Sequence, residues 1–404
     1  MPTDLSPRRA DFPALEQMVR GRRLVYLDNA STTFKPRPVL AAVERMLARE
    51  SANVHRGVHA LSEAATASYE GARAKVAAFL GGKATELVFT RGTTESINLV
   101  AQAWGRHNLR AGDAIVVTEM EHHSNLVPWQ MLCRERDADL RVLPVTDAGT
   151  LDLAALPRVL DQRVKLVALA HVSNVLGVTN PIAAVMAAAH AAGALVLVDG
   201  AQAAGHIPVD VGALGCDFYA VSAHKMLGPT GAGALWARRE LLDAMPPWQG
   251  GGEMVLTVRL DGATYREPPW RFEAGTPDIA GAVGMGAAAD YLTGVGRAAI
   301  AAREAALAVH AAARLAGIPG LRVLGGSRSA PIFAFTLAGL HPHDIATIVD
   351  REGVAIRSGH HCAEPLHRRF GLAASARASL AFYNTEDEVD VLVHALLTAA
   401  EAFA

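Results

Sequence analysis

Cysteine and clustered charge are both scarce in this sequence. Only three cysteines, Cys133, Cys216 and Cys362, occur among 404 residues. An odd and sparse set of thiols excludes a disulfide framework and indicates a reducing compartment. The formal net charge is −2 and no run of lysine or arginine occurs, so the charge pattern favours neither nucleic acid nor an anionic membrane. We therefore expect a cytoplasmic protein that binds neither.

Long hydrophobic runs are scarce as well. Residues 1–23 contain no apolar stretch typical of a secretory signal. The run 182–198 is the one that resembles a membrane span, but His190 and Gly193 interrupt it and Asp199 follows it. A helix, a turn and a strand explain this run better than a membrane span does.

Short apolar runs that alternate with helical patterns are the main structural signal. Four nearly continuous runs predict strands of a parallel sheet covered on both faces, at 113–120, 164–172, 194–202 and 216–225. The pattern predicts an α/β fold with a large, doubly wound, mainly parallel sheet domain. Beyond about Gly294 an alanine-rich helix precedes a smaller α+β domain. We place these domains at 26–290 and 291–404, with 1–25 as an N-terminal segment packing with the small one.

Helix boundary signals surround the segment 180–193. Asn180 is a candidate N-cap, Pro181 suits the first helical position, and Gly193 suits the C-terminal stop. We therefore predict a helix between the second and third of these strands.

Polar residues follow two of the predicted strands. Asp199 comes directly after "LVLV", where a carboxylate is either a structural cap or the partner of a cationic ring nitrogen. Lys225 lies in "SAHKMLGPTG", an apolar, glycine-rich setting in which a lysine can form a Schiff base. Most lone lysines are solvated surface charges. No GxGxxG motif follows an early strand, so nicotinamide binding finds no support.

The stretch "TRGTTESIN" at 90–98 combines a glycine, two threonines and the start of a helix. It is either an ordinary threonine cap or an anion cradle, because free N–H groups and the helix dipole favour negative charge. Pyridoxal phosphate requires a Schiff-base lysine and a carboxylate against its ring nitrogen. Its phosphate also needs an anion cradle. The three features together predict this cofactor.

Two regions rich in histidine carry further candidates. In "EMEHHSN" the adjacent pair His122 and His123 is poorly spaced for one metal, so we predict one ring stacked on a planar cofactor and available for proton transfer. In "RSGHHCAEP" Cys362 is a zinc ligand, a buried structural thiol or a nucleophile. Positive charge from Arg357, His360 and His361 would favour the reactive thiolate.

Ten motifs in order resemble those of class V, fold-type I pyridoxal phosphate enzymes. They are "YLDNASTT", "NVHRGVH", "TRGTTESIN", "EHHSNLVPW", "HVSNVLG", "DGAQ", "SAHKMLGPTGAG", "FEAGTP", "RSGHHCAEP" and "RASLAFYNT". The resemblance covers 26–384 and is strongest to the cysteine desulfurases of the SUF iron–sulfur assembly system. One departure is Ser31, where the family often has alanine; we expect no consequence for the chemistry.

The resemblance implies roles at the cofactor. Lys225 would form the Schiff base, Asp199 would face the pyridinium nitrogen, and Gln202 would face the phenolic oxygen. His122 would stack on the ring. The phosphate would be held by Thr93, Thr94, Ser222 and His224, with Thr276 of the partner subunit.

The resemblance also implies the reaction. Asn174, Arg377 and Arg357 would bind the substrate, with the guanidinium suited to its carboxylate. Cys362 would attack the sulfur of L-cysteine, releasing L-alanine and keeping a persulfide. The persulfide would pass to an acceptor for iron–sulfur cluster assembly.

Two features point to the SUF branch within this family. The segment from Cys362 to "RASLAFYN" is compact, and the loop "PPWQGGGEM" at 246–254 resembles the β-hairpin that covers the active site in that branch. A homodimer with a sulfur acceptor of the SufU or SufE type is implied, SufU slightly favoured. Either His341 or His343 in "HPHD" would then swap onto the acceptor's zinc. Alternatively they belong to an ordinary helix N-terminus.

Two other functions compete with a desulfurase. A selenocysteine lyase would share the fold and could work without the Cys362 thiol. A non-catalytic sulfur or zinc carrier would leave Lys225, Asp199 and the anion cradle unexplained. No metal ligand set is predicted in this chain.

Overall fold

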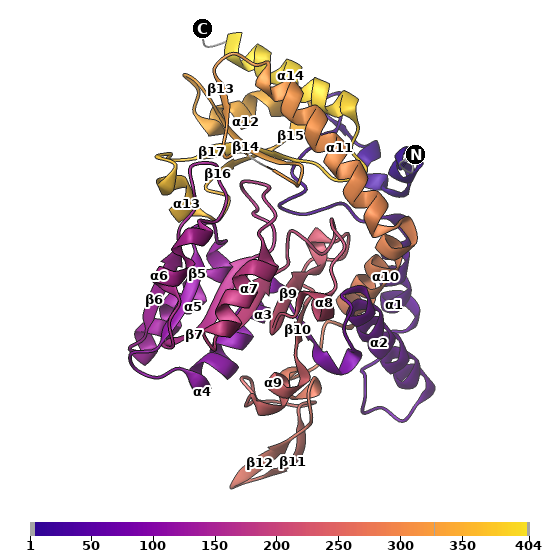
Figure 1. The fold of residues 1–404 in the computed structure, drawn as a ribbon. Coiled ribbons are helices and arrows are strands. Elements are labelled where there is room, and N and C mark those ends of the chain that lie inside the picture. The colour runs from indigo at the N-terminus through magenta and orange to yellow at the C-terminus, as the bar shows by residue number, and fades with distance from the viewer. Residues whose placement is uncertain (1–4, 327, 402–404) are drawn as a thin grey trace.

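A seven-stranded mixed sheet forms the centre of the molecule (Figure 1). The computed structural model describes residues 5–326 and 328–401. From one edge to the other the strands are β4 (Leu87–Thr90), β10 (Gly233–Ala237), β9 (Phe218–Ser222), β8 (Leu195–Asp199), β7 (Val164–Ala170), β5 (Ala114–Thr118) and β6 (Asp139–Leu143). The pairs from β9 through β6 are parallel, whereas β10 is antiparallel to both neighbours. The four predicted strands are confirmed.

Helices cover both faces of this sheet because its strands are apolar on both sides. In β5, Val116 belongs to one core cluster while Ile115 and Val117 belong to the other, as alternation in a strand requires. Helix α7 (Ile182–Ala191) contributes to the first cluster and α5 (Val127–Arg136) to the second. This arrangement confirms the predicted doubly wound α/β class.

The predicted N-cap of α7 is wrong. Pro181 occupies the N-cap position, and the Asn180 side chain caps nothing. Instead Asn180 Nδ2 donates to the carbonyl oxygen of Ala170 at 2.7 Å, which joins the segment before the helix to the end of β7. Gly193 has φ +80°, as expected of a left-handed glycine after a helix.

A smaller antiparallel sheet lies at the end of the molecule where both termini are found (Figure 1). Its order is β13 (Leu321–Val323), β14 (Ile332–Leu337), β17 (Ser375–Ser379) and β16 (Arg357–Gly359). Three helices share its core, α11 (Arg297–Ala316), α12 (Pro342–Arg351) and α14 (Glu386–Glu401). The segment just before β16 belongs to a separate pair, because β15 (Val354–Ala355) runs parallel to β3 (Val25–Tyr26).

The N-terminal segment contacts the C-terminal part of the chain. Arg9 donates to the carbonyl oxygen of Tyr383 and to Glu388, and the Phe12 ring packs against Phe382 and Tyr383. The division of the chain at residues 25 and 290 stays a prediction. Within the described residues, every helix is too short or too polar to span a bilayer.

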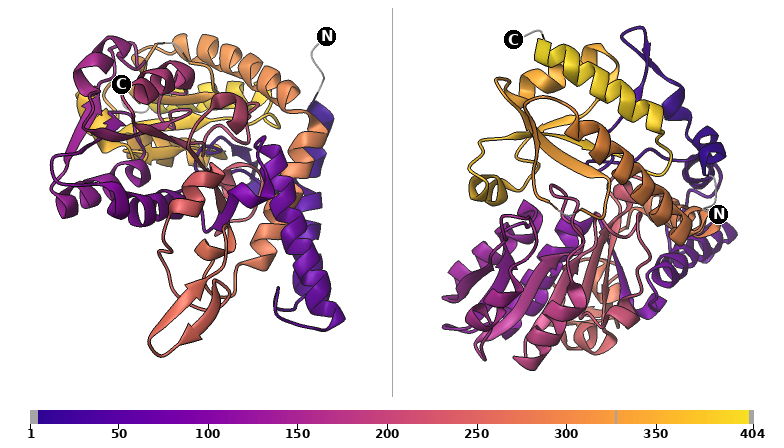
Figure 2. Two further views of the ribbon diagram at one scale, coloured as in Figure 1. Left: turned by 60° about the horizontal axis from the view of Figure 1, so that its bottom comes forward. Right: turned by 45° about the horizontal axis from the view of Figure 1, so that its top comes forward.

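A β-hairpin of β11 (Val255–Arg259) and β12 (Gly262–Tyr265) projects away from the body of the molecule (Figures 1 and 2). The sequence motif placed this feature at 246–254, which is wrong, since that loop only leads into the hairpin. The hairpin extends from the end of the molecule opposite the small sheet (Figure 1). Leu256, Val258 and Leu260 are exposed on it.

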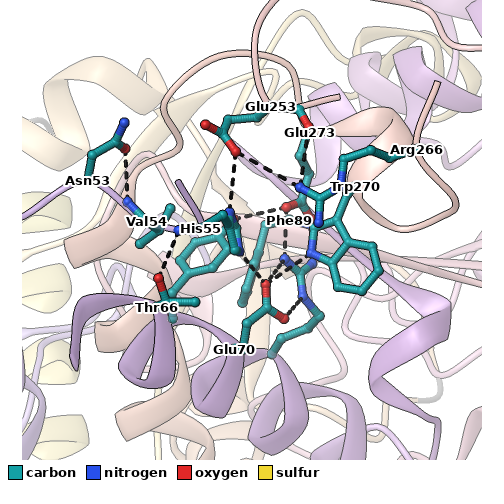
Figure 3. Close-up of polar contacts among 12 residues, drawn as sticks. Asn53, Val54, His55, Thr66, Glu70, Phe89, Glu253, Arg266, Trp270 and Glu273 are labelled. Carbon is teal, nitrogen blue, oxygen red and sulfur yellow. Dashed lines mark hydrogen bonds and ion pairs between the residues drawn. The ribbon is translucent and has the colours of Figure 1, made fainter. Parts of the chain in front are cut away.

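A buried charge cluster holds the base of the hairpin (Figure 3). Glu253 accepts from Arg56 at 3.1 Å, and one of its oxygens lies 3.6 Å from His55 Nδ1. Beneath it Arg73, 1% exposed in its side chain, pairs with Glu70 and Glu273. Arg73 is on α2 (Ala60–Phe79), so the cluster joins this helix to the chain on both sides of the hairpin.

Candidate active site

A cavity of about 220 Å³ lies where β7, β8 and β9 end. Parallel strands present their carboxyl ends at one edge of a sheet, and the segments after them line a crevice there. The structure brings most of the predicted site residues together in this cavity: Thr93, Thr94, His122, Asn174, Asp199, Gln202, Ser222, His224, Lys225, Arg357 and Arg377. Residues separated by almost 300 positions therefore share one pocket.

Lys225 and Asp199 supply an amine and a carboxylate to the part of the cavity that we call its deep end. Asp199 is the last residue of β8, and Lys225 ends the short helix η7 (Ala223–Lys225) that follows β9. Burial lowers the pKa of Lys225 to about 8, although the Asp199 carboxylate opposes this shift. Burial raises the pKa of Asp199. The Lys225 amine therefore loses its proton near pH 8, well below the range of an exposed lysine, as a nucleophilic lysine requires.

The anion cradle is built by backbone that approaches closely. Gly92 has φ +148°, and a Cβ added to Gly233 would lie 2.4 Å from the Gly92 Cα. Only glycine fits such an approach. Helix α3 (Thr93–Leu99) begins here, and the Thr93 N–H donates to Ser222 Oγ at 2.8 Å. Thr94 is exposed at the mouth of this cradle.

His122 is held as a neutral ring by its own turn. Its Nδ1 accepts from the backbone N–H of Ser124 at 3.1 Å, so the ring proton resides on Nε2. Burial and the nearby Lys225 cation lower the pKa of His122 to about 3. The ring therefore enters the cavity with one N–H donor available.

Two arginines converge at the rim beside the small sheet. Arg377, 1% exposed, donates to the Asn174 carbonyl oxygen at 2.9 Å and lies 3.2 Å from an oxygen of Asp28. Burial lowers its pKa to about 10, which still leaves a cation at neutral pH. Arg377 Nη2 and Arg357 Nη1 both donate to Ser31 Oγ at 2.8 Å.

Ser31 has a larger part in this site than its motif predicts. Its hydroxyl donates to Asp28 at 2.7 Å while accepting from Arg357 and Arg377. The expectation that a serine at this position has no consequence for the chemistry stays a prediction, but it did not anticipate these contacts. They arise only when the loop at 28–31 meets β16 and β17, so the sequence held no local signal for them.

Cys362 lies at the margin of the cavity on an unusual turn. It is half-buried, its φ is +57°, and Arg357 Nη2 lies 3.9 Å from its Sγ. The other thiols differ, because burial raises the pKa of Cys133 to about 11 and of Cys216 to about 12. Only Cys362 combines partial exposure with a neighbouring cation, the setting of a reactive thiol.

One predicted source of positive charge at Cys362 is wrong. His361 is 3% exposed, and burial together with Arg377 lowers its pKa to about 2. Its ring is therefore neutral and stabilises no thiolate by charge. Arg357 remains as the cation that contacts the sulfur.

Three predicted residues lie outside the cavity. Thr276 is exposed in a separate groove of about 370 Å³ that Arg91, Glu95 and Trp248 also line. His341 and His343 are exposed at the start of α12, where His341 Nδ1 accepts from the His343 N–H at 3.2 Å. His341 is thus the N-cap of this helix.

Sequence reasoning also missed buried polar residues behind the site. Glu121 accepts from Thr118 Oγ1, Asn125 Nδ2 and the Ala170 N–H, and so joins the ends of β5 and β7 next to His122. Ser375 and His367 lie behind Cys362. Of these residues, only Glu121 carried a signal in the sequence, because it directly precedes the histidine pair.

The comparisons with known proteins agree on one family. The model of the aminotransferase class-V family matches residues 25–392. The chain is 53% identical over 390 residues to a cysteine desulfurase of Dickeya dadantii, covering 96% of this chain and 95% of that protein. A cysteine desulfurase of Klebsiella pneumoniae is 52% identical, with 96% of both chains covered.

Solved structures give the same result. The cysteine desulfurase CsdA of Escherichia coli has a TM-score of 0.93 and 42% identity, and all of both chains is covered. A cysteine desulfurase from Thermococcus onnurineus has a TM-score of 0.94 and 39% identity, again over the whole of both chains.

Proposed function

Because the chain belongs to the class-V aminotransferase family and is a cysteine desulfurase that uses pyridoxal phosphate, we propose that Cys362 takes the sulfur of L-cysteine as a persulfide. The observation that carries this proposal is the position of the Cys362 sulfur. It lies beside Arg357 at the margin of the cavity that holds Lys225 and Asp199.

The residues of the cavity suit the cofactor. Lys225 is an amine with a pKa of about 8, and Asp199 is a buried carboxylate. Helix α3 begins where Gly92 approaches Gly233 closely, and a helix N-terminus favours a phosphate. Lys225 would hold the cofactor's carbonyl carbon, and Asp199 its ring nitrogen. When bound, pyridoxal phosphate supplies an electron sink for the substrate's Cα.

The arginines at the rim suit the substrate carboxylate. Arg377 is held from two sides by the Asn174 carbonyl oxygen and Asp28, so its planar guanidinium keeps one orientation. Arg357 lies beside it and shares Ser31 as a partner. A fixed guanidinium recognises a carboxylate through paired charge-assisted hydrogen bonds.

Proton transfer belongs to Lys225 and His122. With the cofactor bound, Lys225 Nζ would remove the Cα proton of the substrate, because its lowered pKa leaves a large unprotonated fraction near pH 8. His122 presents Nε2–H to the cavity and holds a proton near the substrate.

Sulfur transfer then balances without an added oxidant or reductant. The Cys362 sulfur forms a bond to the substrate sulfur while the substrate's Cβ–S bond breaks. The electron pair of that bond stays with the carbon, which takes a proton and leaves as L-alanine. The enzyme retains Cys362 as a persulfide, and a thiol must reduce it or accept its outer sulfur.

The test is to assay alanine and sulfide from L-cysteine with a reductant, using Cys362→Ala. We expect the variant to keep the visible absorbance of the bound cofactor and to lose alanine formation at least about 100-fold, because the attacking group is gone. Equal alanine production by both proteins would remove Cys362 from the mechanism. If Cys362→Ala loses its activity on L-cysteine but keeps its activity on L-selenocysteine, the result would favour the selenocysteine lyase alternative.

We also propose a homodimer in which Thr276 of the partner subunit reaches the phosphate. In support, the outer side of the cradle at Thr93 and Thr94 opens into a second cavity of about 540 Å³ beside Trp248. Light scattering should give twice the chain mass. Thr276→Val should weaken cofactor binding several-fold, and a monomer with full cofactor affinity would contradict the proposal.

A SUF-type role in the cytoplasm, with sulfur passed to an acceptor for iron–sulfur assembly, is the proposed setting. His341 and His343 are exposed, as zinc exchange with an acceptor of the SufU type requires. An acceptor of the SufE type would not need them. Replacing both by alanine should abolish stimulation by a zinc-containing acceptor and leave basal turnover unchanged. Unchanged stimulation would contradict the role of these histidines.

A further inference from the structure

The turn that carries Cys362 has a backbone conformation that side chains disfavour. His361 has φ +51° and Cys362 has φ +57°. Two consecutive non-glycine residues in the left-handed region persist only where the surroundings hold them. Part of this hold is visible, because Asn174 Nδ2 donates to the His361 carbonyl oxygen at 2.6 Å and the His123 N–H donates to that of Cys362 at 2.7 Å.

A buried chain of three side chains provides the rest. His361 Nε2 and His367 Nε2 each lie 2.9 Å from Ser375 Oγ, and His367 Nδ1 lies 3.0 Å from the Ala363 carbonyl oxygen. Ser375 and His367 are fully buried and His361 is 3% exposed. Ser375 begins β17, and His367 is on α13 (Glu364–Arg369). The hydrogen bonds among the three side chains therefore connect this strand and this helix to the turn.

The direction of each hydrogen bond follows from donor and acceptor chemistry. A carbonyl oxygen only accepts, so His367 carries its proton on Nδ1. Burial lowers the pKa of His367, so its neutral ring accepts the Ser375 hydroxyl proton at Nε2. Ser375 has then donated its only proton, and its oxygen accepts from His361 Nε2–H. His361 Nδ1 is left as a buried acceptor without a partner among the described residues.

We propose that Ser375 and His367 are positioning residues for the Cys362 nucleophile, acting through His361. The hydrogen bonds among His361, Ser375 and His367, which we call the relay, hold the His361 ring in one tautomer and one orientation. The relay thereby holds the left-handed turn that places Cys362 Sγ 3.9 Å from Arg357 Nη2. The inference rests on the assignment of Cys362 as the nucleophile.

The hydroxyl of Ser375 is the group that joins the two histidines, so its removal tests the proposal most directly. Ser375→Ala leaves two imidazole nitrogens facing each other without the atom that joins them, whereas Ser375→Thr retains the oxygen. Ser329→Ala is the matched control. Ser329 also joins distant segments through its hydroxyl, at 2.6 Å from Thr179 Oγ1, but it is exposed and does not line the cavity.

The experiment uses the holoenzyme and two measurements. We expect Ser375→Ala to lower kcat for alanine formation by about 10- to 100-fold with KM for L-cysteine changed less than about threefold, because misplacement of a reacting group affects the chemical step. Alkylation of Cys362 by iodoacetamide at pH 7.5 should slow several-fold, because the thiolate loses Arg357. Ser375→Thr should restore both values to within about threefold, and Ser329→Ala should change neither.

Each other outcome has a defined meaning. Wild-type kcat and alkylation in Ser375→Ala would overturn the proposal, as would equal losses in the alanine and threonine variants with cofactor absorbance intact. If Ser375→Ala does not fold, His367→Asn replaces it, since asparagine can still reach Ala363 but not Ser375. Full alanine formation by Cys362→Ala would instead refute the proposed function itself.

Discussion

The deep end of the cavity and its rim are built in different ways. At the deep end, Asp199 and Ser222 are the last residues of parallel strands, and Lys225 follows one turn later. At the rim, Cys362 and Arg377 depend on side-chain contacts with residues as far away as Ser31. Backbone ladders thus place the cofactor end. At the rim a ladder sets Arg357 opposite Arg377, and side-chain contacts then orient the two guanidiniums and the Cys362 sulfur.

The difference predicts how each end responds to substitution. A residue positioned by a sheet ladder is replaced without moving its neighbours, so the loss is confined to the chemistry of its own side chain. A residue within a network of side chains shares its partners, so its loss disturbs several functions by smaller amounts.

The largest effect should follow Lys225→Ala at the deep end. The variant should lose the absorbance of lysine-linked cofactor and at least about 1,000-fold of kcat, because one amine both holds the cofactor and moves the Cα proton. Absorbance spectra and alanine assays check this, with Lys165→Ala, a strand residue at the opposite end of β7, as control. Activity within tenfold of wild type would contradict the assignment.

Arg377→Lys should have an intermediate effect at the rim. Lysine keeps the charge but cannot contact Asn174, Asp28 and Ser31 together. We expect kcat/KM for L-cysteine to fall by about 10- to 100-fold, the range given by one or two charge-assisted hydrogen bonds. Arg322→Lys, on the exposed side of β13, is the matched control and should be unchanged.

The smallest effect is expected of Ser31→Ala. Both guanidiniums lose a shared acceptor, so KM for L-cysteine should rise by about two- to fivefold with kcat nearly unchanged. Steady-state kinetics measure this, with Ser68→Ala on α2, whose hydroxyl donates to Glu50 at 3.0 Å, as the control. A change in kcat alone would show that Ser31 serves the chemical step rather than substrate binding.

Much of the fold and of the cofactor end could be predicted because the signals are local. Apolar runs indicated β5, β7, β8 and β9, and the polar residues after these strands must meet at one edge of a parallel sheet. The hairpin error is local, because β11 and β12 are adjacent and begin just after the loop at 246–254. Another error occurred where the outcome depended on a tertiary contact, since Asn180 donates to Ala170 at the end of β7 instead of capping α7.

The charge state of the sulfur end could not be predicted for the same reason. His361 beside Cys362 suggested positive charge, but only its burial against Ser375, Arg377 and His367 makes its ring neutral. Ser31 was dismissed because nothing near it in the sequence shows that two arginines reach its hydroxyl.

The sequence by itself determined the layered α/β architecture, the lysine, carboxylate and glycine cradle of the cofactor end, and the family. These follow from periodicity and motifs, which act over a few neighbouring residues. Tertiary structure alone decided which thiol is accessible beside a cation, which histidines are neutral, and how the left-handed turn at Cys362 is held. Those properties depend on desolvation and on hydrogen bonds between segments that meet only when the two sheets pack together.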